Sequence, residues 1–305
     1  MHISRKKYLQ YINPLEIIRT KKILQHNPTL KPVNNQEKTS LLSLFRYNQK
    51  DCTIKQSIPV TTITPSLFES SNNYWLNLDI LNVKTIEQIG NNLALHPLII
   101  EDILSTNQRP KIDEIDGYFT CVLQMLYYNE EEKSIETEQV SFVLGEHFLI
   151  SFQEDSYRDP FNTIREKLKS PISKVRQFDL DFLLYSFIDT IVDQYFIVLD
   201  KIAIQIEKLE EAITQNAPEA YTMNQINDLR KEIMLFKRST FPVRELVSSI
   251  IRSENILIHE RTNKYFKDVY DHVIQANDLC ETYRDVIANL RDLYFSKVNV
   301  KMNEI

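Results

Sequence analysis

Two adjacent carboxylates, Glu101 and Asp102, stand in the otherwise apolar stretch LIIEDIL at residues 98–104. A carboxylate that leaves water is costly unless a cation meets it. Arg109 and Lys111 follow closely and could pair with the two carboxylates on an exposed helix turn. The other candidate is a bound divalent cation, and the local sequence leaves both interpretations open.

Four more side chains could ligate a cation from helical positions. Asp189 and Asp193 lie one helical turn apart in the apolar run at residues 182–199, and Asp268 and His272 have the same spacing in a later helix. Mg²⁺ is usually held by a few carboxylates and retained waters, so sparse pairs of this kind suit it. The alternatives are capping or ion pairing for the aspartates and packing for His272. Zinc coordination would need further His or Cys nearby.

Composition excludes several classes of protein. The three cysteines are far apart and form no zinc or disulfide spacing, which indicates a reducing compartment. The three glycines form no GxGxxG, P-loop or GxSxG motif. No recognisable catalytic set of His, Cys, Ser and carboxylates is present, so we expect no enzyme.

The charge is unevenly distributed along the chain. Residues 1–50 contain ten Lys or Arg and two Asp or Glu, a balance of +8, so the total of −6 leaves −14 for the rest. An acidic body disfavours nucleic acid and suits cations. No signal peptide and no uncharged span of about 18 apolar residues is apparent, because Asp189 and Asp193 interrupt the run at 182–199. We therefore expect the chain as given to be soluble.

The chain divides into four segments by sequence texture. Residues 1–55 are polar and basic and are expected to form a loosely attached lead-in with short helices. Residues 56–172 are expected to form an α/β domain, with strands at 74–80, 118–128, 137–144 and 147–153 and helices at 85–95, 97–105 and near 159–170. Gly145 and Glu146 separate the last two strands and predict a tight hairpin.

Long helices are expected for the remainder. Residues 173–255 have the spacing of two antiparallel acidic helices with a turn near 216–218. Residues 256–305 contain an unbroken 3,4 apolar repeat from Phe266 to Tyr294. A helix of about 40 residues would extend roughly 60 Å, so its apolar seam needs partner helices. No cap closes it, and we expect it to continue beyond Ile305.

Several stretches together resemble the CorA-type magnesium channels. None is diagnostic alone, but they occur in the family's order from about residue 60 to the last residue. The matching stretches are HPLIIEDILSTNQRPK (96–111), EQVSFVL (138–144), DFLLYSFIDTIVDQYF (181–196), FPVREL (241–246), YFKDVYDH (265–272) and LYFSKVNVKMNEI (293–305).

The resemblance implies a fold and an assembly. The expected fold is an α/β/α sandwich with a mixed sheet, followed by long helices, in a funnel-shaped homopentamer. In the family the last helix enters the membrane, and two membrane helices are joined by a Gly-Met-Asn loop. This chain has neither that signature nor a spanning segment. The resemblance therefore implies the cytoplasmic part of a channel in the cell's inner membrane, without its transmembrane helices.

The resemblance also implies roles for the residues above. Asp102 would face Asp268 of a neighbouring protomer, with Glu101, Asp189 and His272 in an adjoining site for Mg²⁺, Co²⁺ or another divalent cation. Asp193 has weaker support as a ligand. Two positions on the last helix, Asp292 and Asn303, correspond to pore-lining residues of the family.

Two alternatives share some of these features. A ZntB-like zinc transporter would have the same architecture, and metal preference would discriminate it. A soluble helical scaffold without a metal role would be indifferent to millimolar Mg²⁺.

Overall fold

The computed structural model describes residues 41–106, 108–154, 158–215 and 220–303. The described residues all belong to one compact unit. Of the lead-in expected over residues 1–55, residues 1–40 lie outside the described part.

A seven-stranded sheet forms the centre of the domain, in the order β2-β1-β3-β7-β6-β5-β4. Only β3 and β7 pair in parallel, so the sheet is mixed as predicted. The strands are β1 (Leu41–Tyr47), β2 (Cys52–Lys55), β3 (Asn73–Asp79), β4 (Lys111–Ile115), β5 (Tyr118–Asn129), β6 (Ser134–Leu144) and β7 (Phe148–Gln153).

The hairpin expected between the last two strands is confirmed. β6 and β7 pair antiparallel up to Leu144 and Leu149. The turn is closed by the Gly145 amide, which donates to the Phe148 carbonyl at 2.8 Å.

Two strands lie within the segment that the sequence assigned to the basic lead-in. β1 pairs with β3 along its whole length, and Phe45 stacks on Trp75 with ring centroids 4.2 Å apart. Both rings are buried. The predicted boundary at residue 55 is therefore wrong for residues 41–55, because their apolar side chains belong to the core on both faces of the sheet.

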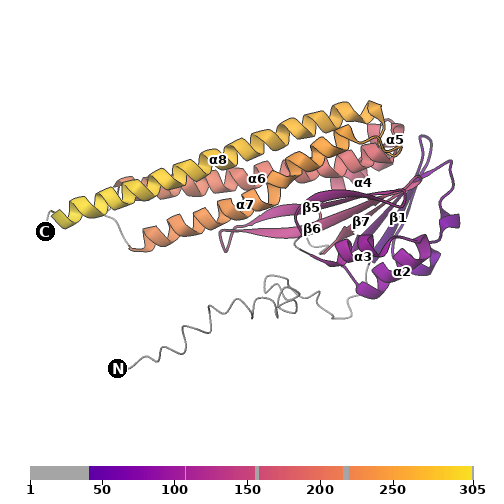
Figure 1. Cartoon of the computed structure of the whole chain (residues 1–305), viewed down its shortest axis with the longest axis horizontal. Helices are drawn as coiled ribbons and strands as arrows, with labels where there is room; N and C mark the ends of the chain where they lie inside the picture. The colour runs from indigo at the N-terminus through magenta and orange to yellow at the C-terminus, as the bar shows by residue number, and fades with distance from the viewer. Residues whose placement is uncertain (1–40, 107, 155–157, 216–219, 304–305) are drawn as a thin grey trace, which may run out of the picture. The chain divides into compact units, whose positions relative to one another are not determined.

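Two short helices, α2 (Val83–Leu93) and α3 (Pro97–Leu104), cover one face of the sheet, as Figure 1 shows. The Asn82 side chain caps α2 by accepting from the Thr85 amide at 3.2 Å, and Pro97 begins α3. Ile99 and Ile103 of α3 are buried against the sheet. Glu101 and Asp102 therefore lie on the sides of the helix that are exposed or partly exposed.

The other face carries the remaining helices, so the domain is an α/β/α sandwich followed by long helices, as predicted. Its helices are α4 (Asn162–Lys169), α5 (Lys174–Gln177), α6 (Leu180–Gln215), α7 (Ala220–Arg252) and α8 (Glu260–Asn303). The turn expected near 216–218 lies outside the described residues.

The long helices α6, α7 and α8 run side by side (Figure 1). Among the described helices, one, α6, is long and apolar enough to cross a membrane, with a mean hydropathy of 1.5 over its best window. In the most apolar stretch of α6, 61% of the residues are buried inside the domain, where the helix packs against the sheet and α8. Its apolar character is therefore accounted for by the core.

A buried carboxylate joins the starts of α6 and α8. Asp181 is fully buried, and its Oδ2 accepts from the His259 amide at 2.8 Å while its Oδ1 accepts from the Phe182 amide at 2.9 Å. The Nδ1 atom of His259 lies 3.3 Å from the same carboxylate. Near the far ends, Lys297 of α8 donates to the Thr214 carbonyl of α6. The two helices therefore run parallel.

Replacing Asp181 with alanine should lower the free energy of unfolding by about 2 to 4 kcal/mol, because the His259 amide loses its acceptor and the fully buried carboxylate leaves a cavity. Chemical denaturation measures the loss. Asp278→Ala, at an exposed position of α8, serves as the matched control and should change stability by less than about 0.5 kcal/mol. Equal stability of the Asp181 and Asp278 variants would contradict this role.

Candidate metal sites

A group of three potential ligands lies between α6 and α8. One oxygen each of Asp189 and Asp193 and one imidazole nitrogen of His272 lie within 4.8 Å of one another. Among the described residues, none of the three forms an ion pair within 4.0 Å. The arrangement brings together two of the predicted ligands and Asp193, which had weaker support.

The register of α6 and α8 explains this meeting. Asp193 follows Asp181 by 12 residues, and His272 follows His259 by 13 residues. At the helical rise these distances are about 18 and 20 Å. Since Asp181 and His259 are in contact and the helices run parallel, Asp193 and His272 arrive at nearly the same height.

The charges in this group are poorly compensated. The pKa of Asp189 is raised by partial burial and by the Asp193 charge, although the Tyr185 hydroxyl donates to Asp189 Oδ2 at 3.3 Å. Partial desolvation raises the pKa of Asp193. The positive charges of His272 and Lys167 oppose this rise, and the negative charge of Asp268 adds to it. A divalent cation would relieve the repulsion between these carboxylates.

His272 offers a free ligand atom. Its Nδ1 is buried and has no hydrogen-bond partner among the described residues. The ring packs edge-on against Phe196, with centroids 6.2 Å apart. Packing thus holds the imidazole in place, and the unpartnered nitrogen remains available to a proton, a water or a metal.

Asp268 extends the group towards solvent. It is exposed, lies one helical turn before His272, and its charge acts on both Asp193 and Tyr185. It therefore faces the same side as the α6–α8 group but is open to a partner outside the chain.

Asp102 has a cation within its own chain. Its Oδ2 lies 2.7 Å from Lys111 Nζ, and its Oδ1 accepts from Gln108 Nε2 at 3.1 Å. The same lysine lies 3.1 Å from Asp113. Of the two local pairings that the sequence left open, the structure forms the one with Lys111. Glu101 beside it is exposed.

The single chain does not bring Glu101 or Asp102 to the other predicted ligands. Their helix, α3, covers one face of the sheet, whereas α6 and α8 lie on the opposite side (Figure 1). The groups of metal-ligand atoms found among the described residues contain neither Glu101 nor Asp102.

A second group, Asp179, Asp181 and His259, was not predicted from the sequence. Arg261 already pairs with Asp179, and Asp181 is engaged by backbone amides. We interpret this group as structural. It could not have been found from spacing, because the His259 amide and Asp181 lie 78 residues apart.

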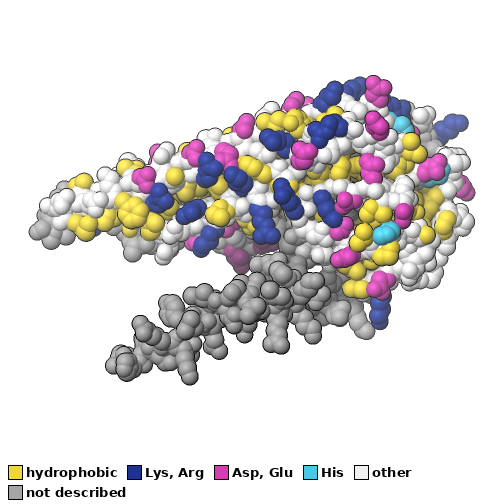
Figure 2. Space-filling model, viewed as in Figure 1, with side chains coloured by type: hydrophobic (Ala, Val, Ile, Leu, Met, Phe, Trp, Pro, Cys, Tyr) yellow, Lys and Arg dark blue, Asp and Glu magenta, His cyan; other side chains and the backbone are white. Residues whose placement is uncertain are grey.

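The two positions predicted to line a pore, Asp292 and Asn303, are exposed near the end of α8. They lie 11 residues apart, so they share a helix face at a separation of about 16 Å. Asp292 pairs with the neighbouring Arg291 at 3.2 Å. Around them Leu293, Phe295 and Met302 are also exposed, and Figure 2 shows hydrophobic side chains among the charged ones along the long helices.

Comparison with known proteins identifies the family. The model of the family described as CorA-like Mg²⁺ transporter protein matches residues 70–305. The chain belongs to the CorA-like Mg²⁺ transporter family. Its members are membrane transporters of metal ions and not enzymes, as expected from the sequence.

A curated CorA relative covers most of the described chain. The cobalt/magnesium transport protein CorA of Thermotoga maritima is 37% identical over 238 residues, which are 78% of this chain and 67% of that protein. The chain thus spans about two thirds of the length of this CorA.

Solved structures of CorA and ZntB share the fold. The soluble domain of CorA from Methanocaldococcus jannaschii superimposes with a TM-score of 0.69 at 16% identity, covering 83% of this chain and 96% of that domain. The ZntB cytoplasmic domain from Vibrio parahaemolyticus gives a TM-score of 0.65 at 18% identity, covering 85% and 98%. The architecture is therefore that of the soluble domains of these transporters.

Substituting Asp193 by asparagine should raise the melting temperature without divalent cations by about 1 to 3 °C at neutral pH, because it removes one of two repelling charges. Melting in EDTA followed by circular dichroism measures this. Asp200→Asn, at an exposed position of the same helix, is the control and should change little. A lower melting temperature for Asp193→Asn than for the control would show that the pair is not under repulsion.

Proposed function

We propose that this chain is the Mg²⁺-sensing and gating part of a CorA-like channel that takes up magnesium, with cobalt or nickel as further cargo. In this proposal the described domain lies in the cytoplasm, and α8 leads towards membrane helices in the inner membrane. The observation that carries it is the unpaired cluster of Asp189, Asp193 and His272 beside the exposed Asp268, in a chain of this family.

Five copies arranged in a ring would complete the sites. Asp102 and Asp268 lie on helices at opposite sides of the sheet, so one copy's α3 can meet the next copy's α8. A head-to-tail contact of this kind closes into a ring when its rotation allows. Exposed apolar side chains on α8, including Leu293 and Phe295, would then pack around the central axis.

Gating would follow from charge. With Mg²⁺ bound, facing carboxylates of neighbouring copies are neutralised, and the symmetric closed ring is stabilised by linkage. When Mg²⁺ falls, the carboxylates repel one another, the domains separate and the helices around the pore relax. Rings of Asp292 and Asn303 would hold hydrated ions in the pore by hydrogen bonds.

Lys111 enters this mechanism as a tethered cation. Its pKa is raised, since the bonds to Asp102 and Asp113 outweigh the partial burial that disfavours its charge. In a ring without Mg²⁺ it would offset only part of the Asp102 charge, because Asp113 shares it, and Mg²⁺ would have to displace it. Lys111 would thereby set the Mg²⁺ concentration at which the site fills.

The donor set favours Mg²⁺ over Zn²⁺. The ligands proposed are carboxylates with one imidazole, and zinc sites usually combine several His or Cys. ZntB shares the fold, so architecture alone does not separate the two cargoes. Calorimetric titration with each metal separates them, with Mg²⁺ or Co²⁺ preferred in our proposal.

Replacing Asp102 by asparagine should abolish most of the rise in melting temperature that millimolar Mg²⁺ produces in the parent chain, because the inter-copy site loses a ligand. Asp268→Asn should act alike. The control is Asp278→Asn, which changes the same charge at another exposed position of α8. An undiminished Mg²⁺ response in both Asp102 and Asp268 variants would refute the assignment.

A second arm of that experiment uses Lys111→Met. Loss of the competing ammonium should lower the Mg²⁺ concentration at half-response by about two- to fivefold. Lys84→Met, at an exposed position of α2, should leave that concentration unchanged.

A further inference from the structure

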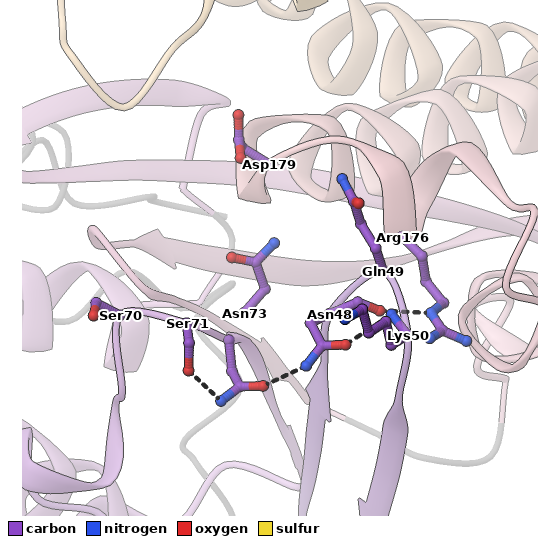
Figure 3. Close-up of a pocket in the computed structure, with 9 residues that line it drawn as sticks. Asn48, Gln49, Lys50, Ser70, Ser71, Asn73, Arg176 and Asp179 are labelled. Atoms are coloured by element: carbon purple, nitrogen blue, oxygen red, sulfur yellow. Dashed lines mark hydrogen bonds between the residues drawn. The ribbon is translucent and has the colours of Figure 1, made fainter.

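A polar pocket of about 450 Å³ lies on the domain away from the proposed metal sites. Its walls are formed by the β1–β2 turn, the loop that leads into β3, α5 and the residue before α6, and Figure 3 shows the lining side chains. Its lining consists of polar and charged side chains: Asn48, Gln49, Lys50, Ser70, Ser71, Asn72, Asn73, Arg176 and Asp179. A pocket without apolar walls does not suit a hydrophobic ligand.

Arg176 is the unusual member of this lining. It is only 3% exposed, yet it forms no ion pair within 4.0 Å among the described residues. Its Nε donates to the Asn48 carbonyl at 2.8 Å, while its Nη2 is buried without a hydrogen-bond partner in the part of the chain that the structure describes. A buried guanidinium with an unused donor is costly unless an anion meets it.

The carboxylate in the lining does not meet this need. Asp179 lies away from Arg176 in the pocket and is engaged by Arg261, with His259 Nε2 at 3.7 Å (Figure 3). Lys50 adds a second positive charge on the pocket rim. Burial raises the pKa of the nearby Cys52 thiol, and the positive charges of Arg176 and Lys169 partly oppose this rise. Among the described residues, the two cations of the lining, Arg176 and Lys50, form no ion pair, and the nearby Glu69 carboxylate accepts from Asn72 Nδ2 at 3.1 Å.

Neutral side chains on the pocket rim hydrogen-bond to one another and to the backbone. Asn48 Oδ1 accepts from the Lys50 and Asp51 amides at 2.8 Å, which fixes the turn. Asn48 Nδ2 donates to Asn72 Oδ1 at 2.9 Å, and Asn72 Nδ2 donates to Ser71 Oγ at 3.1 Å. This network holds the rim of the pocket in one arrangement beside Arg176, as the dashed lines in Figure 3 show.

We propose that this pocket binds the phosphate group of a small phosphorylated molecule, with Arg176 and Lys50 as the anion-binding residues. Arginine presents a planar set of donors that matches phosphate oxygens, and lysine adds a mobile charge. The pocket volume exceeds that of a bare phosphate ion, so a phosphorylated metabolite such as a nucleotide fits as well as inorganic phosphate. This site is independent of the proposed cation sites.

Thermal melting of the full chain in EDTA tests the proposal. Inorganic phosphate and ATP are added separately at millimolar concentration, each against sodium chloride of equal ionic strength. The parent should gain about 2 to 4 °C with at least one of them. A larger gain with ATP identifies a phosphorylated metabolite as the ligand class, and equal gains identify free phosphate.

Variants assign the effect to the pocket. Arg176→Met should abolish the gain, and Lys50→Met, at an exposed position, should reduce it about threefold or more. Lys84→Met carries the same charge change on α2 and should respond like the parent. The proposal is overturned if neither anion stabilises the parent beyond the salt control, or if Lys50→Met and folded Arg176→Met respond like the parent.

Discussion

The contact between Asp181 and the start of α8 sets the geometry on which the cation sites depend. A fully buried carboxylate in the first turn of α6 accepts a hydrogen bond from the His259 amide just before α8, so both helices start from one fixed point. From there, equal helical rise brings Asp193 and His272 to the same height. A slip of α8 by one residue would rotate its side chains by about 100° and remove His272 from the cluster. The function proposed for the cluster therefore depends on a carboxylate whose contacts join two helices.

A second constraint is that the proposed ligands are divided between opposite sides of the sheet. One half, Asp189, Asp193 and His272, is assembled within the chain and has raised aspartate pKa values. The other half, around Asp102, is occupied by Lys111 at 2.7 Å. A single chain thus holds one undercompensated half-site and one half-site with an internal cation. On assembly, the half-site of Asp189, Asp193 and His272 would attract a divalent ion. At the other half-site, that ion would replace Lys111 as the partner of Asp102.

Sequence reasoning succeeded where local patterns decide the structure. The β6–β7 hairpin, the two helices of the α2–α3 pair and the long helices follow from alternation, from Pro97 and from the 3,4 repeat. The strand β4 was missed, although the Asp116-Gly117 pair that follows it is a strong hairpin signal in the sequence. In the structure both residues have the positive φ angles that such a turn requires, 51° and 83°. The strands β1 and β2 were missed because the basic charge of residues 1–50 concealed a short apolar run.

What could not be predicted depends on contacts between distant residues. Lys111 and Arg109 were equal candidates for pairing with Asp102 in the sequence, and only the position of β4 beside α3 selects Lys111. The role of Asp181 depends on the residue before α8, because the His259 amide that donates to it lies 78 residues away in the sequence. Likewise, the uncompensated charge of Arg176 is visible only once burial is known.

The most direct measurement of the central claim is the position of a bound ion in a crystal of the assembled chain. Co²⁺ scatters anomalously and suits the same oxygen ligands, so a crystal grown with Co²⁺ shows where the cation binds. The account predicts an anomalous peak between Asp102 of one copy and Asp268 of the next, with Lys111 moved away from Asp102. Peaks elsewhere only, with Lys111 still paired to Asp102 across a formed interface, would contradict it.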